Sequence, residues 1–558
     1  MPVTEMLTPV TLKQRRMNSM LAYLVFLLLN FFAACQDSDE ISTMAENARL
    51  IQNRIPLFIE RENPDAVSVS FSVPAVVSSV ELNAVEIFFS EGSQTEILET
   101  VSVSRRSDEQ PGKSVFGESA GNASPVRIRG TQSLAAGHHF LFFNFSLKKD
   151  AALEKSFQIE KVELIFAGEK RWTLKPEKTF TYRPALVLRA AGQDQCDTYR
   201  IPGLITTNSG ALVAVYDNRY NNSKDLQEYI DIGMSRSLDG GQSWEPMKVI
   251  MDRGQFGGLP EELNGVGDPC VLYDHLHNTI WVAALWLHGF SKDQMAWWVS
   301  KPGLSAQETG QFLLVKSTDD GLTWSEPVNI TAQIKDPSWQ LLLQGPGRGI
   351  TLNDGTLVFP AQFKADIGVK AIDGGQYTSH STIVYSRDGG QSWSVGSGAK
   401  SNTTEAQVVQ LTDGRLMLNM RDDRNRKEKG ELNGRAVAVS ADLGKTWEVH
   451  PSSNLLLPEP NCMAGLIAAD VRVDGGMKKV LFFSNPDNKE QRTNMTIKTS
   501  LDEGLTWPDA LQVELNETAG YGYSCMTMTD ENTVGILYEG VKELYFQKIN
   551  VSELISGK

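Results

Sequence analysis

Cysteine is scarce in this sequence, with five residues among 558, which is too few for a disulfide-stapled scaffold. Basic residues are also outnumbered: 53 Lys and Arg stand against 68 Asp and Glu, which gives a net charge of −15. Such an acidic chain has no general attraction for phosphate backbones, so nucleic acid is not expected as a partner, and any bound anion needs a local group of arginines. Hydrophobic residues (41%) and charged residues (22%) are near globular averages, which excludes a disordered chain and a polytopic membrane protein.

The one long apolar run lies at the N-terminus, from Met20 to Ala34, and follows a basic segment. Fifteen residues suit the apolar region of a signal peptide better than a membrane span. The run ends in Phe32-Ala-Ala-Cys35, which resembles the lipobox of bacterial lipoproteins. We therefore expect residues 1–35 to be an export signal of lipoprotein type and residues 36–49 a tether. Lipidated Cys35 would attach the protein to the bacterial cell envelope, whereas ordinary cleavage would secrete it.

Residues 50–185 carry short segments rich in β-branched and aromatic residues, separated by polar stretches with Gly or Pro. No long helical pattern intervenes, apart from a short helical candidate at 47–54. This spacing predicts a β-sandwich over 50–185. The predicted strands are 66–73, 84–89, 138–145 and 161–166.

The rest of the chain is organised by a repeat, Ser-x-Asp-x-Gly-x-[Ser/Thr]-Trp, which occurs five times. The copies begin at Ser237, Ser317, Ser386, Ser440 and Ser500. The Asp can accept hydrogen bonds from nearby N–H groups, the Gly supplies a positive φ, and the Trp can pack into a core, which is the chemistry of a hairpin turn. Five catalytic or metal-binding aspartates are the less favoured interpretation.

The spacing of the repeats predicts the architecture of residues 186–558. Each copy follows a predicted strand, and residues 185–550 divide into six units of 61 residues. We therefore predict an all-β protein, with a six-bladed β-propeller after the sandwich. The sixth unit would lack the motif or be built from both chain ends.

These repeats resemble the Asp-boxes of sialidases, and Tyr199-Arg200-Ile201-Pro202 resembles the Arg-Ile-Pro motif that opens the catalytic domain of that family. The resemblance covers 185–550, and the N-terminal region resembles the accessory domain of some bacterial sialidases. It implies an exo-sialidase that acts on sialylated glycans with net retention, without a cofactor or metal, and as a monomer.

The resemblance implies three arginines for the carboxylate of a sialic acid, because Arg is a planar, permanently charged, bidentate donor. Arg200 matches the first through its motif, Arg421 the second, and Arg492 the third. Arg435 competes for this role, but it enters the strand of a repeat and is predicted to be structural.

Three further residues match the family's catalytic group. Sialidases use a Tyr where most retaining glycosidases use a carboxylate, since the substrate's own carboxylate would repel a second one. Tyr523 matches this nucleophile, with Tyr521 as a neighbour that could be confused with it, and Glu405 matches its base. Asp268, on an apparent Gly-rich loop, matches the acid that protonates the glycosidic oxygen and later activates water.

Supporting residues follow from the same resemblance. Arg219 and Asp225 resemble a pair beside O4 and the N-acyl group of the sugar, and Glu539 resembles the carboxylate that orients Arg200. Aromatic walls of the pocket would decide the choice of acceptor, and the candidates are Trp286, Trp297 and Trp298.

Two alternatives to hydrolysis remain open. A trans-sialidase would transfer the sugar to an acceptor or within the molecule, and a non-catalytic propeller would only bind glycans. A propeller without activity would be expected to lose one of Asp268, Glu405 and Tyr523, and none is missing. The segment His275-Leu-His277 is read as a turn rather than as a metal site, because no further ligands accompany it.

Overall fold

The computed structural model describes residues 47–77, 79–108, 112–291 and 294–556. The expected export signal (1–35) and the first part of the expected tether (36–49) lie outside the described residues. No helix in the described part of the chain is long and apolar enough to cross a membrane.

The chain divides into two compact units, and their boundary differs from the predicted one at 185/186. The first unit contains residues up to Asn53, Glu62–Ser146 and Phe157–Thr181. The second contains Arg54–Arg61, Leu147–Ser156 and Tyr182–Lys558. Segments of the predicted sandwich range therefore group with the second unit. One reason is that strand β12, which crosses 185/186, pairs with the last strand of the chain.

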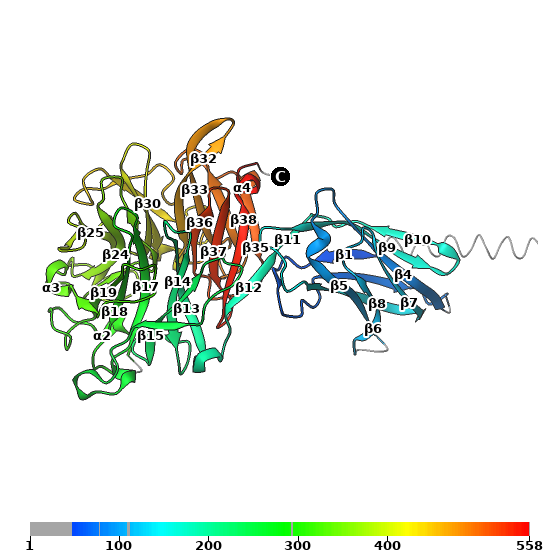
Figure 1. Ribbon diagram of the computed structural model, residues 1–558, viewed down its shortest axis with the longest axis horizontal. Coiled ribbons are helices and arrows are strands. Elements are labelled where there is room, and N and C mark those ends of the chain that lie inside the picture. Colours follow the sequence, from blue (N-terminus) through cyan, green and yellow to red (C-terminus); the bar gives the residue numbers. More distant parts are fainter. Residues whose placement is uncertain (1–46, 78, 109–111, 292–293, 557–558) are drawn as a thin grey trace, which may run out of the picture. The chain divides into compact units, whose positions relative to one another are not determined.

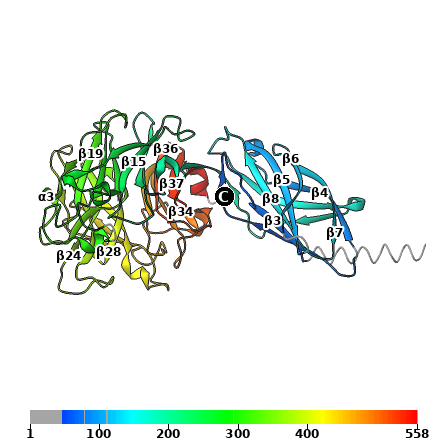
Figure 2. The same ribbon diagram turned by 90° about the horizontal axis from the view of Figure 1, so that it is seen from below.

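The first unit is a β-sandwich of two antiparallel sheets (Figure 2). Contacts between aromatic rings join the sheets: the Phe145 and Phe157 centroids lie 5.5 Å apart, and those of Phe71 and Trp172 lie 5.8 Å apart. One sheet has the order β1 (Arg49–Gln52), β3 (Val67–Val73), β8 (Gly137–Leu147), β5 (Leu98–Ser107), β6 (Ser114–Ala120). The other has the order β10 (Arg171–Leu174), β9 (Phe157–Phe166), β4 (Ser79–Phe89), β7 (Val126–Ala135).

The four strands predicted here are present, and the helical candidate at 47–54 is wrong. Residues Arg49–Gln52 form β1, which pairs with β3 from Arg49↔Ser70 to Gln52↔Val67. The alternating burial along β3 shows the period of a half-buried strand. Pairing with this strand overrides the weak local helical pattern.

The described residues of the second unit form six sheets that follow one another along the chain (Figure 1). Their inner strands, β13, β17, β24, β28, β32 and β36, each contact the next, and β36 contacts β13, so the ring is closed as in a β-propeller. Five of the sheets are each built from one continuous stretch of chain. One contains β13 (Thr198–Thr206) to β16 (Lys248–Met251), and the next contains β17 (Val266–Asp274), β18 (Thr279–Trp286), β19 (Gln311–Ser317) and β20 (Val328–Asn329). The third contains β21 (Leu341–Gln344), β24 (Leu357–Ala365), β25 (Thr378–Ser386) and β26 (Ser394–Val395), the fourth β28 (Thr403–Gln410) to β31 (Glu448–Val449), and the fifth β32 (Gly465–Val473) to β35 (Gln512–Asn516).

The remaining sheet joins the two ends of this unit. Strand β12 (Pro184–Arg189) pairs with β38 (Leu544–Asn550), which continues to β37 (Thr533–Glu539) and β36 (Ser524–Asp530). This sheet carries no copy of the repeat, in agreement with the expectation that one unit combines both chain ends. The short strand β2 (Leu57–Phe58) adds to its edge.

The five repeats form identical turns after the third strand of their sheets. In the copy at Asp388, the carboxylate accepts hydrogen bonds from the backbone N–H of Ser392 (2.9 Å) and from its hydroxyl group (2.5 Å). These hydrogen bonds lower the pKa of Asp388 to about 2. The backbone N–H of Gly390, which has φ 83°, donates to Ser386. The aspartates are thus bound within their own turns, as the structural interpretation of the repeat requires.

Candidate active site

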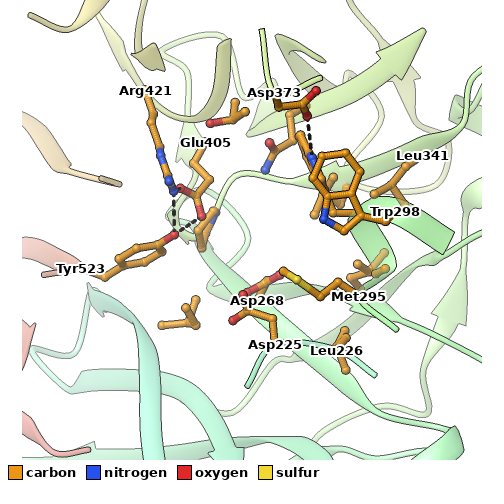
Figure 3. A pocket seen from close by; sticks show the side chains of 18 of the residues that line it. Asp225, Leu226, Asp268, Met295, Trp298, Leu341, Asp373, Glu405, Arg421 and Tyr523 are labelled. Atoms are coloured by element: carbon orange, nitrogen blue, oxygen red, sulfur yellow. Dashed lines mark hydrogen bonds and ion pairs between the residues drawn. The ribbon is translucent and has the colours of Figure 1, made fainter. Parts of the chain in front are cut away.

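A pocket of about 550 Å³ is lined by all three predicted catalytic residues, Asp268, Glu405 and Tyr523 (Figure 3). Figure 3 shows Arg421, Glu405 and Tyr523 together on one side and Trp298 on the opposite side. The polar and aromatic lining residues are Asp225, Asp268, Trp297, Trp298, Gln362, Asp373, Thr404, Glu405, Arg421, Arg426, Lys427 and Tyr523. The apolar lining comes mainly from Leu226, Leu285, Met295, Leu341, Leu343 and Ile372.

The inner strands place the site residues by a shared device, a register shift near their first residues. The pairing of β13 shifts between Arg200 and Gly203, that of β17 between Gly267 and Cys270, and that of β28 between Thr403 and Ala406. Such bulges change the direction of side chains at a strand end. Asp268 and Glu405 lie within the shifts, so Asp268 belongs to a strand and not to the loop that its glycines suggested.

Glu539 links the first arginine to the predicted nucleophile. Its carboxylate accepts a hydrogen bond from Nε of Arg200 (3.1 Å), from the backbone N–H of Ile201 (2.9 Å) and from the backbone N–H of Tyr523 (2.9 Å). The Glu539 side chain is fully buried. It therefore fixes the Arg200 rotamer, as expected, and also the backbone of Tyr523, the residue just before β36.

The second arginine contacts both members of the predicted nucleophile–base pair. Nη1 of Arg421 donates to Glu405 (2.5 Å) and to the Tyr523 hydroxyl oxygen (3.1 Å), while Nη2 donates to Asn461 (3.0 Å). The Tyr523 hydroxyl group donates in turn to Glu405. A phenol, a carboxylate and a guanidinium thus form one charge-assisted network at the pocket wall.

The Tyr523 phenol is neutral in the resting site. Burial and the negative charge of Glu405 raise its pKa well above the usual value, against the opposite effect of Arg421 and Arg492. A neutral phenol becomes a nucleophile only when a base takes its proton, and Glu405 is already bonded to that proton.

The third arginine lies beside Tyr523 rather than in the wall of the pocket. The Arg492 guanidinium carbon lies 5.6 Å from the centroid of the Tyr523 ring, and its Nη1 donates to the carbonyl of Tyr521 (2.7 Å). Arg435, in contrast, is fully buried, is not among the residues that line the pocket, and donates to Glu459, to Asn419 and to the carbonyl of Cys462. This environment agrees with a structural role for Arg435.

Two carboxyl groups, Asp268 and Asp225, lie close to each other at the pocket (Figure 3). Burial and the charges of Asp217 and Asp225 raise the pKa of Asp268 well above the usual value of a carboxyl. Desolvation also acts to raise the pKa of Asp225, but Arg219 and Arg200 outweigh it, and the net shift is downward. Asp268 is therefore the member of the pair that keeps its proton more readily.

Arg219 lies behind these carboxyl groups and is not among the residues that line the pocket. Its side chain is 1% exposed and donates to Asp217 (2.8 Å), to the carbonyl of Ser223 (2.7 Å) and to Asp225 (2.7 Å). The backbone N–H of Asp268 donates to the same Asp217. Arg219 and Asp217 thus position the two carboxyl groups that face the pocket, and no motif in the sequence had marked Asp217.

Two of the three tryptophan candidates line the pocket. Trp297 and Trp298 belong to the short helix α2 (Ala296–Val299), and Lys364 Nζ lies 4.2 Å and 4.6 Å from their ring centroids. Trp286 does not line the pocket; it packs against Phe256 in the core of the propeller. The prediction of Trp286 as a wall residue is therefore wrong.

Other residues of the site carried no recognisable signal. Asn461 binds Arg421 through its side chain, and its carbonyl lies 3.5 Å from Arg492. Gln362 lines the pocket with a buried Oε1 that has no hydrogen-bond partner. Within the part of the chain that the structure describes, no group of three or more His, Cys, Asp or Glu side chains could hold a metal ion.

Comparisons with known proteins bear on the family and the fold of this chain. The family model described as a BNR repeat-like domain matches residues 210–536. A sialidase from Bacteroides fragilis (strain YCH46) is 40% identical over 564 residues, which cover 96% of this chain and 99% of that protein. The solved structure of the Hadza microbial sialidase Hz136 has a TM-score of 0.79 and 39% identity, and the match covers 91% of this chain and 100% of that one. A leech intramolecular trans-sialidase, at 15% identity and a TM-score of 0.55, supports the fold alone; that match covers 92% of this chain and 99% of the leech chain.

Proposed function

We propose that this chain, which belongs to the sialidase family and is an exo-sialidase acting on sialylated glycans, works with net retention through a covalent intermediate on Tyr523. The observation that carries this mechanism is the bonded group of Tyr523, Glu405 and Arg421. It unites a nucleophile, its base and a carboxylate-binding cation.

The chemistry follows from the charges of the substrate. Arg200, Arg421 and Arg492 hold the carboxylate on the anomeric carbon, and a second carboxylate attacking there would be repelled. Glu405 instead takes the proton of Tyr523, whose oxygen forms a bond to the anomeric carbon while the bond to the leaving sugar breaks. Water then attacks the same carbon, and the tyrosine oxygen leaves and takes back its proton from Glu405, so that two displacements restore the original anomeric configuration.

The leaving sugar needs a proton, and the pair of Asp268 and Asp225 supplies it. Asp268 is the first choice, because burial and the charges of Asp217 and Asp225 raise its pKa and so favour its protonated form. Asp225 is the second candidate, because 46% of its side chain is exposed and because it pairs with Arg200. An anionic substrate that engages Arg200 would weaken this pair and so raise the pKa of Asp225. The carboxyl that gives up the proton can later take one from water.

The stereochemical test uses NMR of the reaction with sialyllactose. Two displacements at one carbon retain configuration, so the α-anomer of free sialic acid should appear first and should convert to the β-anomer only slowly. A β-anomer as the first product would exclude the covalent intermediate. An anhydro sugar or a sialylated acceptor as the main product would instead identify a trans-sialidase.

The proton donor can be identified with Asp268→Asn and Asp225→Asn, each assayed on sialyllactose and on an aryl sialoside with a good leaving group. Loss of general acid catalysis costs about 10²- to 10⁴-fold on the natural substrate, and far less where the leaving group needs no proton. We expect this contrast for Asp268→Asn, together with loss of the alkaline limb of the pH profile, because only the protonated carboxyl is active. The same contrast for Asp225→Asn alone would assign the proton to Asp225 instead.

We also propose export to the bacterial cell envelope. This rests on the apolar run, the preceding basic residues and the lipobox-like end at Cys35. Labelling with a lipid precursor should mark the unmodified protein and not a Cys35→Ala variant. If neither protein is labelled, Cys35 is not lipidated, and secretion after ordinary cleavage is the favoured route.

A further inference from the structure

Lys364 is a buried cation behind the wall of the catalytic pocket, and the proposed mechanism gives it no task. It lies on β24, two residues after Gln362, which does line the pocket. The Lys364 side chain is only 1% exposed and is not among the lining residues. Lysine is almost never buried to this extent without partners, so its contacts indicate what it holds in place.

Lys364 joins two parts of the pocket wall. From helix α2, the carbonyl of Trp297 accepts a hydrogen bond from Nζ (3.0 Å), and the ring centroids of Trp297 and Trp298 lie 4.2 Å and 4.6 Å from the same atom. From the segment between β24 and β25, the carboxylate of Asp373 lies 3.8 Å from Nζ. Asp373 also accepts a hydrogen bond from Nε1 of Trp297 (3.0 Å; Figure 3), so a cation, a carboxylate and two indole rings form one closed group.

The charge of Lys364 also bears on the charge that the pocket presents to its substrate. Asp373 lines the pocket, and its side chain is only 7% exposed. An unpaired carboxylate at this place would repel an anionic sugar, and it would gain hydration by turning out of the wall. Lys364 compensates this charge from behind the wall and removes both effects.

This compensation holds only while Lys364 is protonated. Burial lowers the pKa of Lys364 to about 8, against the opposite effect of Asp373 and Asp423. Asp423 belongs to the short helix η6 (Asp423–Arg426) and is itself paired with Arg426 (3.0 Å). Lys364 therefore loses its proton as the pH rises through about 8, whereas a lysine in water keeps its proton until about pH 10.

We propose that Lys364 is a positioning residue for substrate binding, which holds the tryptophans of α2 and Asp373 together as one pocket wall only while it carries its charge. Substrate binding by this chain then weakens in mildly alkaline solution, and the chemical step does not depend on Lys364. The inference goes beyond the proposed function, because it needs only a pocket that binds an anionic sugar and not the covalent intermediate on Tyr523.

The test measures kcat and KM from about pH 6 to about pH 10 on an aryl sialoside with a good leaving group, since this substrate does not need the proton of a carboxyl group. In the unmodified protein KM should rise about 2- to 30-fold above about pH 8, as expected for the loss of a desolvated cation–π contact, while kcat stays nearly constant. Lys364→Met should show the high KM already at neutral pH, with no further rise. Lys364→Arg, which keeps its charge throughout, should keep KM low.

Tryptophan fluorescence gives a second measurement that does not depend on catalysis. The emission should change near pH 8 in the unmodified protein, because two indole rings lie against the group that titrates, and this change should be absent from Lys364→Met. The matched control is Lys335→Met, at a second buried lysine whose pKa is also lowered to about 8 but which does not line the pocket and donates to the carbonyls of Gly303 and Trp339. This variant should keep the alkaline rise in KM.

Each outcome decides the question. A KM that does not change with pH in the unmodified protein, the same alkaline rise in Lys364→Met, or a loss of kcat alone would overturn the positioning role. If Lys364→Met does not fold, Asp373→Asn decides, because removing this carboxylate lowers the pKa of Lys364 and should move the rise in KM and the fluorescence change to lower pH; an unmoved midpoint would overturn the proposal. If the unmodified protein fails to hydrolyse the aryl sialoside at any pH, the sialidase function itself fails, whereas hydrolysis with a pH-independent KM means that only the positioning role fails.

Discussion

Tyr523→Phe should reduce turnover by several orders of magnitude while KM changes far less. The substitution removes only the phenol oxygen, which the mechanism uses as the nucleophile. The arginines that hold the substrate carboxylate keep their other partners, since Arg200 is bonded to Glu539, and Arg421 to Glu405 and Asn461. Steady-state kinetics on sialyllactose measures the effect, and an unchanged thermal unfolding curve would show that packing survives.

Two companion variants make this result specific. Glu405→Gln should lose about 10²- to 10⁴-fold, because the phenol, whose pKa is raised by burial, then lacks its base. Tyr521→Phe should stay near normal, since the ring beside Arg200 (4.8 Å) remains. The reverse result for the two tyrosines would place the nucleophile at Tyr521, and full activity of both variants would exclude a tyrosine mechanism.

The fold could be predicted largely because its repeat is local. Each Asp-box lies within eight residues, and the hydrogen bonds of its Asp carboxylate and of its first Ser hydroxyl group are made within its own turn, so the sequence shows the complete turn. The boundary at 185/186 could not be read in this way. Strand β12 pairs with β38, more than 350 residues later, and this pairing joins it to the second unit. The helical candidate at 47–54 failed for the same reason, since its partner strand decides its conformation.

The residues of the site also divide into those that local motifs could predict and those that they could not. Arg200, Glu405 and Tyr523 stand in short motifs at the starts of inner strands, where the ring of sheets brings distant segments together. Asn461 stands in no motif, and its importance comes from its hydrogen bond to Arg421. Trp286 shows that proximity in sequence is not sufficient. It lies on the same face of β18 as Ile280, Val282 and Ala284, and these residues pack together in the core rather than in the pocket wall.

The structure also changes what the arginines are expected to do. Arg219 is bonded to Asp217, Asp225 and the Ser223 carbonyl and its side chain is only 1% exposed, so it is expected to support the acid pair instead of meeting the sugar directly. Arg200 and Arg421 each donate to a carboxylate that also accepts a hydrogen bond from Tyr523. For Arg200 this carboxylate is Glu539, and for Arg421 it is Glu405. In the proposed mechanism, carboxylate binding and nucleophile activation are therefore coupled through the same side chains, and most directly at Arg421.

Arg421→Ala should consequently cost more than the loss of one ligand contact. Loss of a charged, bidentate partner costs about 2–4 kcal/mol, or roughly 30- to 1000-fold in kcat/KM, and Glu405 would also lose the cation that pairs with it. Arg421→Lys keeps the charge but cannot bond Glu405, Tyr523 and Asn461 together, so it should recover only part of the loss. The control is Arg415→Ala, which should behave like the unmodified protein. Arg415 lies just before β29 (Leu416–Asp422), the strand that contains Arg421, and pairs with Asp413 at the surface. If kcat falls and KM rises for Arg421→Ala, Arg421 serves both binding and activation. A rise in KM alone would limit it to binding, and unchanged kinetics would remove it from the site.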